Sequence, residues 1–252
     1  MKNTKKLFFL IALLGSTSFF AQTKATIVVA ANLKTAMDSI YKVYHKENPA
    51  DVIQITYGAS GKFYEQITNG APFDVFFSAD MNFPIKLKES RFAISAVKLY
   101  AIGRIAIWSK KIDPNAQKMN SLLDPKVKKI SIANPVTAPY GAKAVESMKR
   151  TKIYNKVKTN LVYGENITQA AQFVAFGAAD IGIIAFSDVL SPAMKKERGK
   201  YYLIPQENHS PLEQGAVILK HGKGNATALR FYDYISSNKA KAILKHYGYS
   251  LK

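Results

Sequence analysis

Residues 26–41 read TIVVAANLKTAMDSIY, and this stretch decides the fold class. Residues 26–30 form a short apolar run rich in β-branched side chains, which predicts a buried strand. The apolar residues that follow recur at the spacing of one helix face, namely Leu33, Ala36, Met37, Ile40, Tyr41 and Tyr44. Asn32 stands between the two patterns and is a residue type that helix N-caps prefer. The stretch therefore predicts a strand that leads directly into a helix.

The same unit recurs along the chain. Further strands are predicted at 52–57, 74–78, 97–108, 129–133, 157–163, 180–186, 201–206 and 215–220. Helices are predicted to follow the turns at 58–61, 139–141 and 164–166, and two more close the chain at about 224–237 and 238–247. Alternating strands and helices predict an α/β fold with mostly parallel, helix-flanked sheets. Two lobes joined by crossing strands fit this length better than one sheet: 22–102 with 206–252 as lobe 1, and 103–205 as lobe 2.

Composition narrows the function classes. The 252 residues carry 36 Lys+Arg and 17 Asp+Glu, a formal net charge of +19, with no Cys and four His. Without Cys there is no disulfide framework, thiol nucleophile or Cys-ligated zinc, and the scattered positions of the four His argue against a His-rich metal site. The basic residues are spread singly rather than interleaved with aromatics, so we expect solvated lysines and no nucleic-acid partner. A positive surface speeds the capture of a small anion.

The N-terminus has the pattern of a signal peptide. Three lysines precede an almost purely apolar run at 7–14, and Ala21 offers a small residue for cleavage. We predict that residues 1–21 are removed and that the rest is exported, with an uncleaved membrane anchor as the alternative. The apolar run is too short for a spanning helix, and no second stretch is long enough.

Four of the predicted strand-to-helix turns share a property that suits anion binding. They lie at 30–32, 59–61, 139–141 and 166–168, each at the carboxyl end of a strand, where open α/β sheets bind ligands. A helix start presents free N–H groups and a positive dipole end. Asn32 and Ser60 add side chains that can donate hydrogen bonds. Ordinary helix capping is the alternative for each turn alone, since spacing does not show that the turns converge.

Several segments resemble the periplasmic molybdate-binding proteins. The ligand loops of that family are matched by 28–36 and 58–62, and its most distinctive run by NGAPFDVFFSAD at 69–80. Further matches lie at 100–104, 134–141, 164–167, 231–235 and 247–248, in order to the C-terminus. The resemblance implies a type II periplasmic binding protein, expected to be a monomer. We expect it to close its two lobes on molybdate, and on tungstate as well, and to deliver the anion to the membrane permease of an ABC importer, with no enzymatic activity and no cofactor.

The resemblance also implies which residues contact the anion. The polar donors of the first two loops correspond to Asn32 and Ser60, and the main-chain donors of the other two correspond to the N–H groups of Tyr140 and Ile167. Ala31 is expected to add its own N–H. All of these groups would contact the oxygens of molybdate, with no direct ligation of the metal.

One departure leaves the choice of anion open. Some members use a tyrosine hydroxyl on the strand where this chain has Ala185, which cannot donate. A cleft of about six donors, each worth roughly 1.5–3 kcal/mol to a charged group, still reaches micromolar affinity without a buried counter-charge. The alternatives are a binder of a different small oxyanion and a serine hydrolase that uses Ser60. Against the hydrolase, Lys62 stands where the motif G-x-S-x-G requires its last glycine.

Overall fold

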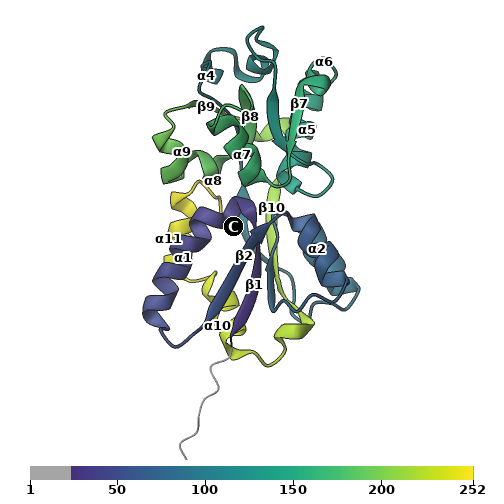
Figure 1. Ribbon diagram of the computed structural model, residues 1–252. Coiled ribbons are helices and arrows are strands. Elements are labelled where there is room, and N and C mark those ends of the chain that lie inside the picture. Colours follow the sequence, from purple (N-terminus) through teal and green to yellow (C-terminus); the bar gives the residue numbers. More distant parts are fainter. Residues whose placement is uncertain (1–23, 252) are drawn as a thin grey trace, which may run out of the picture.

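The computed structural model describes residues 24–251 and divides them between two sheets stacked end to end (Figure 1). The predicted signal peptide at 1–21 lies outside the described residues. Within residues 24–251, no helix combines the length and the apolar character needed to cross a lipid bilayer.

Lobe 1, the lower lobe in Figure 1, is built on a five-stranded sheet of order β2-β1-β3-β10-β4. Only β10 runs against its neighbours, so the other four strands point the same way. The strands are β1 (Ala25–Ala30), β2 (Ile53–Gly58), β3 (Val75–Phe77), β4 (Lys98–Gly103) and β10 (Leu212–Ile218). The helices of this lobe are η1 (Ala31–Leu33), α1 (Lys34–Glu47), α2 (Ser60–Thr68), α3 (Asn82–Glu89), η5 (Lys220–Gly222), α10 (Ala226–Tyr234) and α11 (Asn238–His246).

Lobe 2 repeats the plan with the order β7-β6-β8-β5-β9, and here β5 is the strand that runs against the others. Its strands are β5 (Ile105–Ser109), β6 (Ile130–Ala133), β7 (Leu161–Gly164), β8 (Ile181–Ala185) and β9 (Lys200–Leu203). Its helices are α4 (Pro114–Gln117), η2 (Lys118–Leu123), α5 (Pro139–Arg150), α6 (Tyr154–Val157), η3 (Lys158–Asn160), α7 (Ile167–Ala175), α8 (Phe186–Val189) and α9 (Pro192–Lys196). The helix η4 (Gln206–Asn208) lies on the connection back to lobe 1.

The chain crosses between the lobes at Arg104 and again through residues 204–211. The prediction of one continuous strand over 97–108 is therefore wrong. β4 and β5 are separate because they pair in different sheets, β4 with β10 and β5 with β8 and β9. The Arg104 guanidinium donates to the carbonyl of Ile204, which ties the two crossings together. Apolar patterning alone does not reveal this break, since the residues on both sides of it are buried.

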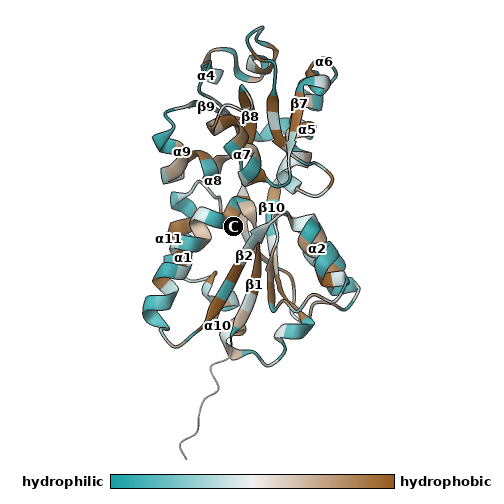
Figure 2. Cartoon of the chain, viewed as in Figure 1, coloured by the Kyte–Doolittle hydropathy of each residue, from teal (hydrophilic) through white to brown (hydrophobic). Residues whose placement is uncertain are grey.

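Apolar side chains hold each sheet to its helices. Figure 2 shows hydrophobic residues concentrated on the strands of both lobes, with hydrophilic residues on the outward sides of the helices. Every residue of β3, β5, β6 and β8 is buried. Strands covered on both faces read as continuous apolar runs, which is why these elements are visible in the sequence.

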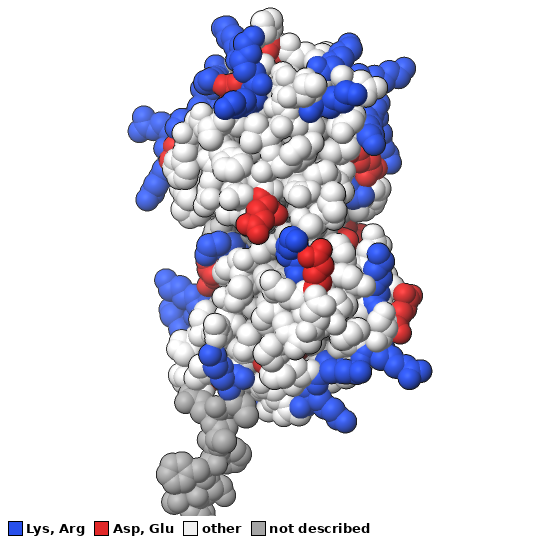
Figure 3. Space-filling view, turned by 45° about the vertical axis from the view of Figure 1, so that its right-hand side comes forward, with Lys and Arg blue, Asp and Glu red and all other residues white. Residues whose placement is uncertain are grey.

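Charged side chains lie on the outside of both lobes. In the view of Figure 3, Lys and Arg lie singly or in small groups, mainly around the edges of the lobes, with a few Asp and Glu between them. Many are paired, for example Lys34 with Asp38 at 2.8 Å. Exposed pairs of this kind stabilise a fold little, so the lysine excess is a property of the surface and not of the core.

Candidate functional site

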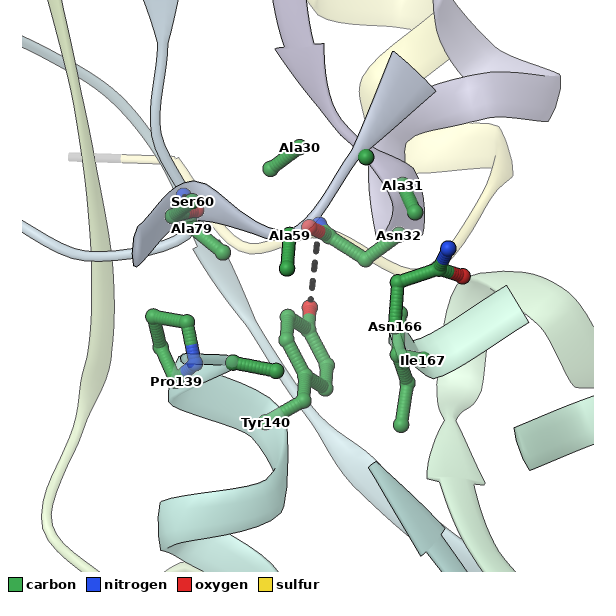
Figure 4. Close-up of a pocket in the computed structure, with 12 residues that line it drawn as sticks. Ala30, Ala31, Asn32, Ala59, Ser60, Ala79, Pro139, Tyr140, Asn166 and Ile167 are labelled. Carbon is green, nitrogen blue, oxygen red and sulfur yellow. Dashed lines mark hydrogen bonds between the residues drawn. The ribbon is translucent and has the colours of Figure 1, made fainter. Parts of the chain in front are cut away.

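A small cavity lies between the two lobes, and all of the sequence-predicted site residues line it. Ala31, Asn32 and Ser60 come from lobe 1, and Tyr140 and Ile167 come from lobe 2 (Figure 4). The other lining residues are Ala30, Gly58, Ala59, Ala79, Ala138, Pro139 and Asn166. About 10 Å³ is open to the centre of a water molecule, which is room for about one water.

Four helix starts meet at this cavity. Ser60 is the first residue of α2, Tyr140 the second of α5 and Ile167 the first of α7, while Asn32 lies in η1, which leads into α1. The N–H groups of a first helical turn have no intrahelical acceptor, and the helix dipole is positive there. Both lobes therefore bring main-chain N–H groups and the positive ends of helix dipoles to one small volume.

Local sequence fixes the starts of the two lobe 2 helices. Pro139 occupies the first position of α5, where its fixed φ suits the helix and its missing N–H costs nothing. The Asn166 side chain caps α7 by accepting from the Gln169 N–H at 3.0 Å. Gly141 lets α5 approach the end of β6 closely, because a Cβ there would lie 2.1 Å from the Ala133 carbonyl oxygen. These contacts hold the main chain of Tyr140 and Ile167 in place.

The hydroxyl hydrogen of Ser60 is available for donation into the cavity. Its Oγ accepts a hydrogen bond from the Ala79 N–H at 2.9 Å, and the residue is buried. Because a hydroxyl carries one hydrogen and two lone pairs, this contact uses a lone pair and leaves the hydrogen for a group in the cavity.

Asn32 stands at the centre of a buried polar network. Its Nδ2 lies 2.9 Å from the Tyr249 hydroxyl, 3.0 Å from Gln214 Oε1 and 3.3 Å from the Tyr140 hydroxyl. Its Oδ1 is buried and has no hydrogen-bond partner. Figure 4 shows the carboxamide end of Asn32 directed at the Tyr140 hydroxyl, with Ala59 beside it. The amide that the sequence singles out thus contacts both lobes.

Sequence reasoning missed the partners of Asn32. Gln214, Tyr249 and Ser187 lie 182, 217 and 155 residues away along the chain, so spacing gives no hint of them. For Tyr140 only the main chain was predicted, yet its hydroxyl accepts from Gln214 Nε2 at 3.0 Å. The sequence carries no clear signal for Gln214, because it follows Glu213 near the start of β10 (LEQGAVI) and precedes the predicted strand at 215–220. Burial raises the pKa of the hydroxyls of Tyr140 and Tyr249 far above the usual value, so both stay protonated.

Direct hydrogen bonds join the lobes around the cavity. The Gly61 N–H donates to the Thr137 carbonyl at 2.8 Å, and the Thr168 hydroxyl donates to the Ala31 carbonyl at 3.1 Å. Ala185 is the position at which some members of the family have a tyrosine hydroxyl. It is the last residue of β8 and is fully buried. Just beyond it, the Ser187 hydroxyl donates to the Asn32 carbonyl at 2.9 Å. The two walls of the cavity are therefore in direct contact with each other.

The cavity is lined without charge. None of the residues that line it is Asp, Glu, Lys, Arg or His, so Ser60 has no base beside it in the lining. Lys62 is half exposed and pairs with Glu65 at 3.0 Å. Nearby Asp188 is buried, and burial raises its pKa to about 8, so this carboxyl is mostly neutral near pH 7. Within residues 24–251, no three His, Asp or Glu side chains are grouped as metal ligands.

Comparisons with known proteins agree on one family. Residues 25–250 match the bacterial extracellular solute-binding protein family. The molybdate-binding protein ModA of Azotobacter vinelandii is 38% identical over 227 residues, covering 90% of this chain and 89% of that protein. ModA of Rhodobacter capsulatus is 36% identical over 88% of this chain and 86% of its own length. The structure of the A. vinelandii periplasmic molybdate-binding protein superposes with a TM-score of 0.83 at 32% identity, covering 90% of this chain and 99% of that chain.

Proposed function

Because the chain belongs to the bacterial extracellular solute-binding protein family and its relatives are molybdate-binding proteins, we propose that it captures molybdate outside the cytoplasm and delivers it to an ABC importer. Ser60, Asn32 and the main-chain N–H groups of Ala31, Tyr140 and Ile167 bind the oxygens of the anion. The metal itself touches no protein atom.

One observation carries this proposal: four helix starts from two lobes border one small cavity whose lining has no charged side chain. A dianion taken out of water needs a hydrogen-bond donor for every oxygen. Helix starts supply such donors at fixed positions and add the positive ends of their dipoles. Charge-assisted hydrogen bonds are worth roughly 1.5–3 kcal/mol each, so about six are enough for micromolar or tighter binding.

The choice among oxyanions follows from the types of groups in the lining. Phosphate carries a proton on part of its population near neutral pH, since its second pKa is about 6, and that proton needs an acceptor. Molybdate and tungstate carry none, so a cavity of donors favours both of them and separates them poorly. Sulfate is also fully deprotonated, so the type of donor does not separate it from molybdate; we expect discrimination against it to come from its smaller size.

Entry of the anion requires movement of the lobes. A tetrahedral oxyanion is larger than the single water for which the cavity has room. The lobes therefore separate to admit it and close around it, turning about the two crossings at Arg104 and 204–211. The protein acts as an exported monomer after loss of residues 1–21, and its partner is the membrane permease of the importer.

Isothermal titration calorimetry with four anions tests the proposal. Molybdate and tungstate should release or absorb heat with micromolar or tighter affinity, and sulfate and phosphate should bind at least tenfold more weakly. The absence of a binding signal with molybdate and tungstate would overturn the proposal. Tight binding of phosphate instead would assign the protein to a different oxyanion.

A further inference from the structure

Gly61 lies where the main chains of the two lobes are in direct contact. It is the second residue of α2, directly after Ser60, and its N–H donates to the Thr137 carbonyl of lobe 2 at 2.8 Å. Away from the two crossings, no other pair of main-chain atoms in residues 24–251 forms a hydrogen bond between the lobes. The remaining interlobe hydrogen bonds near the cavity involve at least one side chain, such as those of Thr168 and Ser187.

This contact leaves no room for a side chain at position 61. A Cβ there would lie 2.8 Å from the Thr137 carbonyl oxygen, a separation that real side chains essentially never adopt. The nearest lobe 1 atom outside α2 is the end of the Phe83 ring, at 3.2 Å. Gly61 is helical and has no positive φ, so its backbone conformation suits any L-residue. The approach of lobe 2, and not the backbone of lobe 1, therefore requires the glycine.

The lobe 2 side of the contact is a loop that is closed on itself. Residues 134–138 connect β6 to α5, and Asn134 accepts from the N–H groups of Val136 and Ala138 at 3.0 and 2.9 Å. The loop contains a proline, and a second proline begins α5, so two φ angles are fixed. Thr137 is buried in this loop. Its carbonyl cannot move back without moving the start of α5.

The contact lies beside two of the proposed anion donors, one on each wall. Gly61 directly follows Ser60, and Thr137 precedes Tyr140 by three residues. Ser60 and Tyr140 both line the cavity. The closest approach of Gly61 to Thr137 therefore sets the width of the gap across which the donors of the two walls reach the solute.

We propose that Gly61 is a specificity-determining residue: its main-chain contact with Thr137 stops the closing of the lobes at the separation that fits the anion. The inference rests on the proposed function, since it takes the solute to be an oxyanion held between the walls. A methyl group at position 61 keeps the walls apart by roughly half an ångström. Hydrogen bonds to oxygen span about 2.7–3.2 Å, so this extra distance weakens the grip of one wall and penalises small anions most.

Gly61→Ala tests the proposal with two measurements that should change in opposite directions. Without solute, urea unfolding should show equal or greater stability than in the parent, because alanine suits a helix and restricts the unfolded chain. Molybdate affinity, measured by calorimetry, should fall roughly tenfold to a hundredfold. Gln66→Ala, at an exposed position of the same helix, is the matched control and should bind like the parent.

The selectivity of the variant separates a stop for closure from other causes of weak binding. Chromate is a smaller tetrahedral dianion than molybdate, so at pH 8 the ratio of molybdate to chromate affinity should rise in Gly61→Ala and stay constant in Gln66→Ala. A crystal structure of Gly61→Ala with molybdate should show the distance from Ser60 Oγ to the Tyr140 nitrogen increased by roughly half an ångström over the parent.

Three results would overturn the proposal. The first is a Gly61→Ala protein that binds molybdate as tightly as the parent. The second is a loss of affinity together with a loss of stability, because damage within lobe 1 would then account for both. The third is an unchanged ratio of molybdate to chromate affinity with an unchanged distance between Ser60 and Tyr140. A parent protein that binds no molybdate contradicts the proposed function instead.

Discussion

Both walls of the cavity present hydrogen-bond donors, but one wall uses mainly side chains and the other uses the main chain. The lobe 1 wall, formed by Asn32 and Ser60, donates mainly through side chains whose other hydrogen bonds run to neighbours such as Ala79 and Gln214. The lobe 2 wall, formed by Tyr140 and Ile167, donates through the main chain at the starts of α5 and α7. A side-chain donor depends on its neighbours for its direction, while a main-chain donor is held by a whole helix.

This difference has a consequence for mutation. The two side-chain donors of the lobe 1 wall, Asn32 and Ser60, can be removed or reversed by single substitutions. Those of the lobe 2 wall survive any substitution that preserves the helix start, since every residue except proline carries the N–H. Binding measurements on single variants should therefore be asymmetric between the lobes, which the following predictions test in order of decreasing effect.

Asn32→Asp should have the largest effect. The substitution keeps the shape of the side chain but places a carboxylate beside the dianion, and juxtaposed like charges cost several kcal/mol. We expect molybdate affinity to fall roughly a thousandfold or more by calorimetry. Asn69→Asp makes the same change of net charge at an exposed residue after α2 and should bind like the parent. Comparable affinity in Asn32→Asp would place the anion away from the lobe 1 wall.

Ser60→Ala should weaken binding by about 1–3 kcal/mol, because it removes one hydrogen bond to a charged group. Asn32→Ala belongs in the same range. The control is Ser39→Ala, which removes a hydroxyl that donates to the Thr35 carbonyl within α1, away from the cavity. If Ser60→Ala and Asn32→Ala both bound molybdate as tightly as Ser39→Ala, the anion would have to occupy another cleft.

Stability should fall with rising pH because of Asp188, behind the lobe 2 wall. Burial raises the pKa of this carboxyl from 3.8 to about 8, so between these values the folded protein holds a proton that the unfolded chain has lost. The contribution is complete below pH 4 and disappears as pH rises through 8, with a slope of up to about 1.4 kcal/mol per pH unit. Urea unfolding from pH 5 to pH 9 measures it.

Asp188→Asn should flatten that dependence, because the amide cannot lose a proton in this range. Asp233→Asn, at an exposed aspartate on α10, should keep the parent's slope. A parent protein whose free energy of unfolding rose between pH 6 and pH 8 would contradict the assignment to Asp188.

Ile167→Val should have the smallest effect on binding. The variant retains the main-chain N–H at the start of α7, so we expect molybdate affinity to change by less than about 0.5 kcal/mol. The lost methylene group should still lower the free energy of unfolding by about 0.5–1.5 kcal/mol, since Ile167 is buried. A tenfold loss of affinity with unchanged stability would show that the side chain, not the main chain, contacts the anion.

The sequence predicts the elements of this fold well where their apolar pattern is local. The apolar run before Asn32 becomes β1, and the turns that precede Ser60, Pro139 and Ile167 begin α2, α5 and α7. The break at Arg104 is not predictable in this way, because β4 and β5 are separated by their pairing partners and not by their composition.

For the site, the sequence predicts candidate donors, all of which line the cavity, but not the buried groups that contact them. Asn32 and Ser60 are residue types that caps prefer, and only the resemblance to known binding proteins suggested that they face a common ligand. Gln214 and Tyr249 reach Asn32 from β10 and from the C-terminal residues, because the chain returns to lobe 1 after building lobe 2. A contact made by such a return has no local signature.

The hydrogen bonds that join the lobes also bear on the timing of release. In three of them the acceptor is a main-chain carbonyl, that of Ala31, Asn32 or Thr137. Two of these carbonyls, those of Ala31 and Asn32, belong to η1, which also carries the Asn32 side chain. Separation of the lobes therefore breaks these hydrogen bonds and the contacts to the bound solute at the same time. The residence time of the solute is then set by the frequency of that event rather than by diffusion out of a channel. A permease that holds the lobes apart would release the solute without having to bind it more tightly than this protein does.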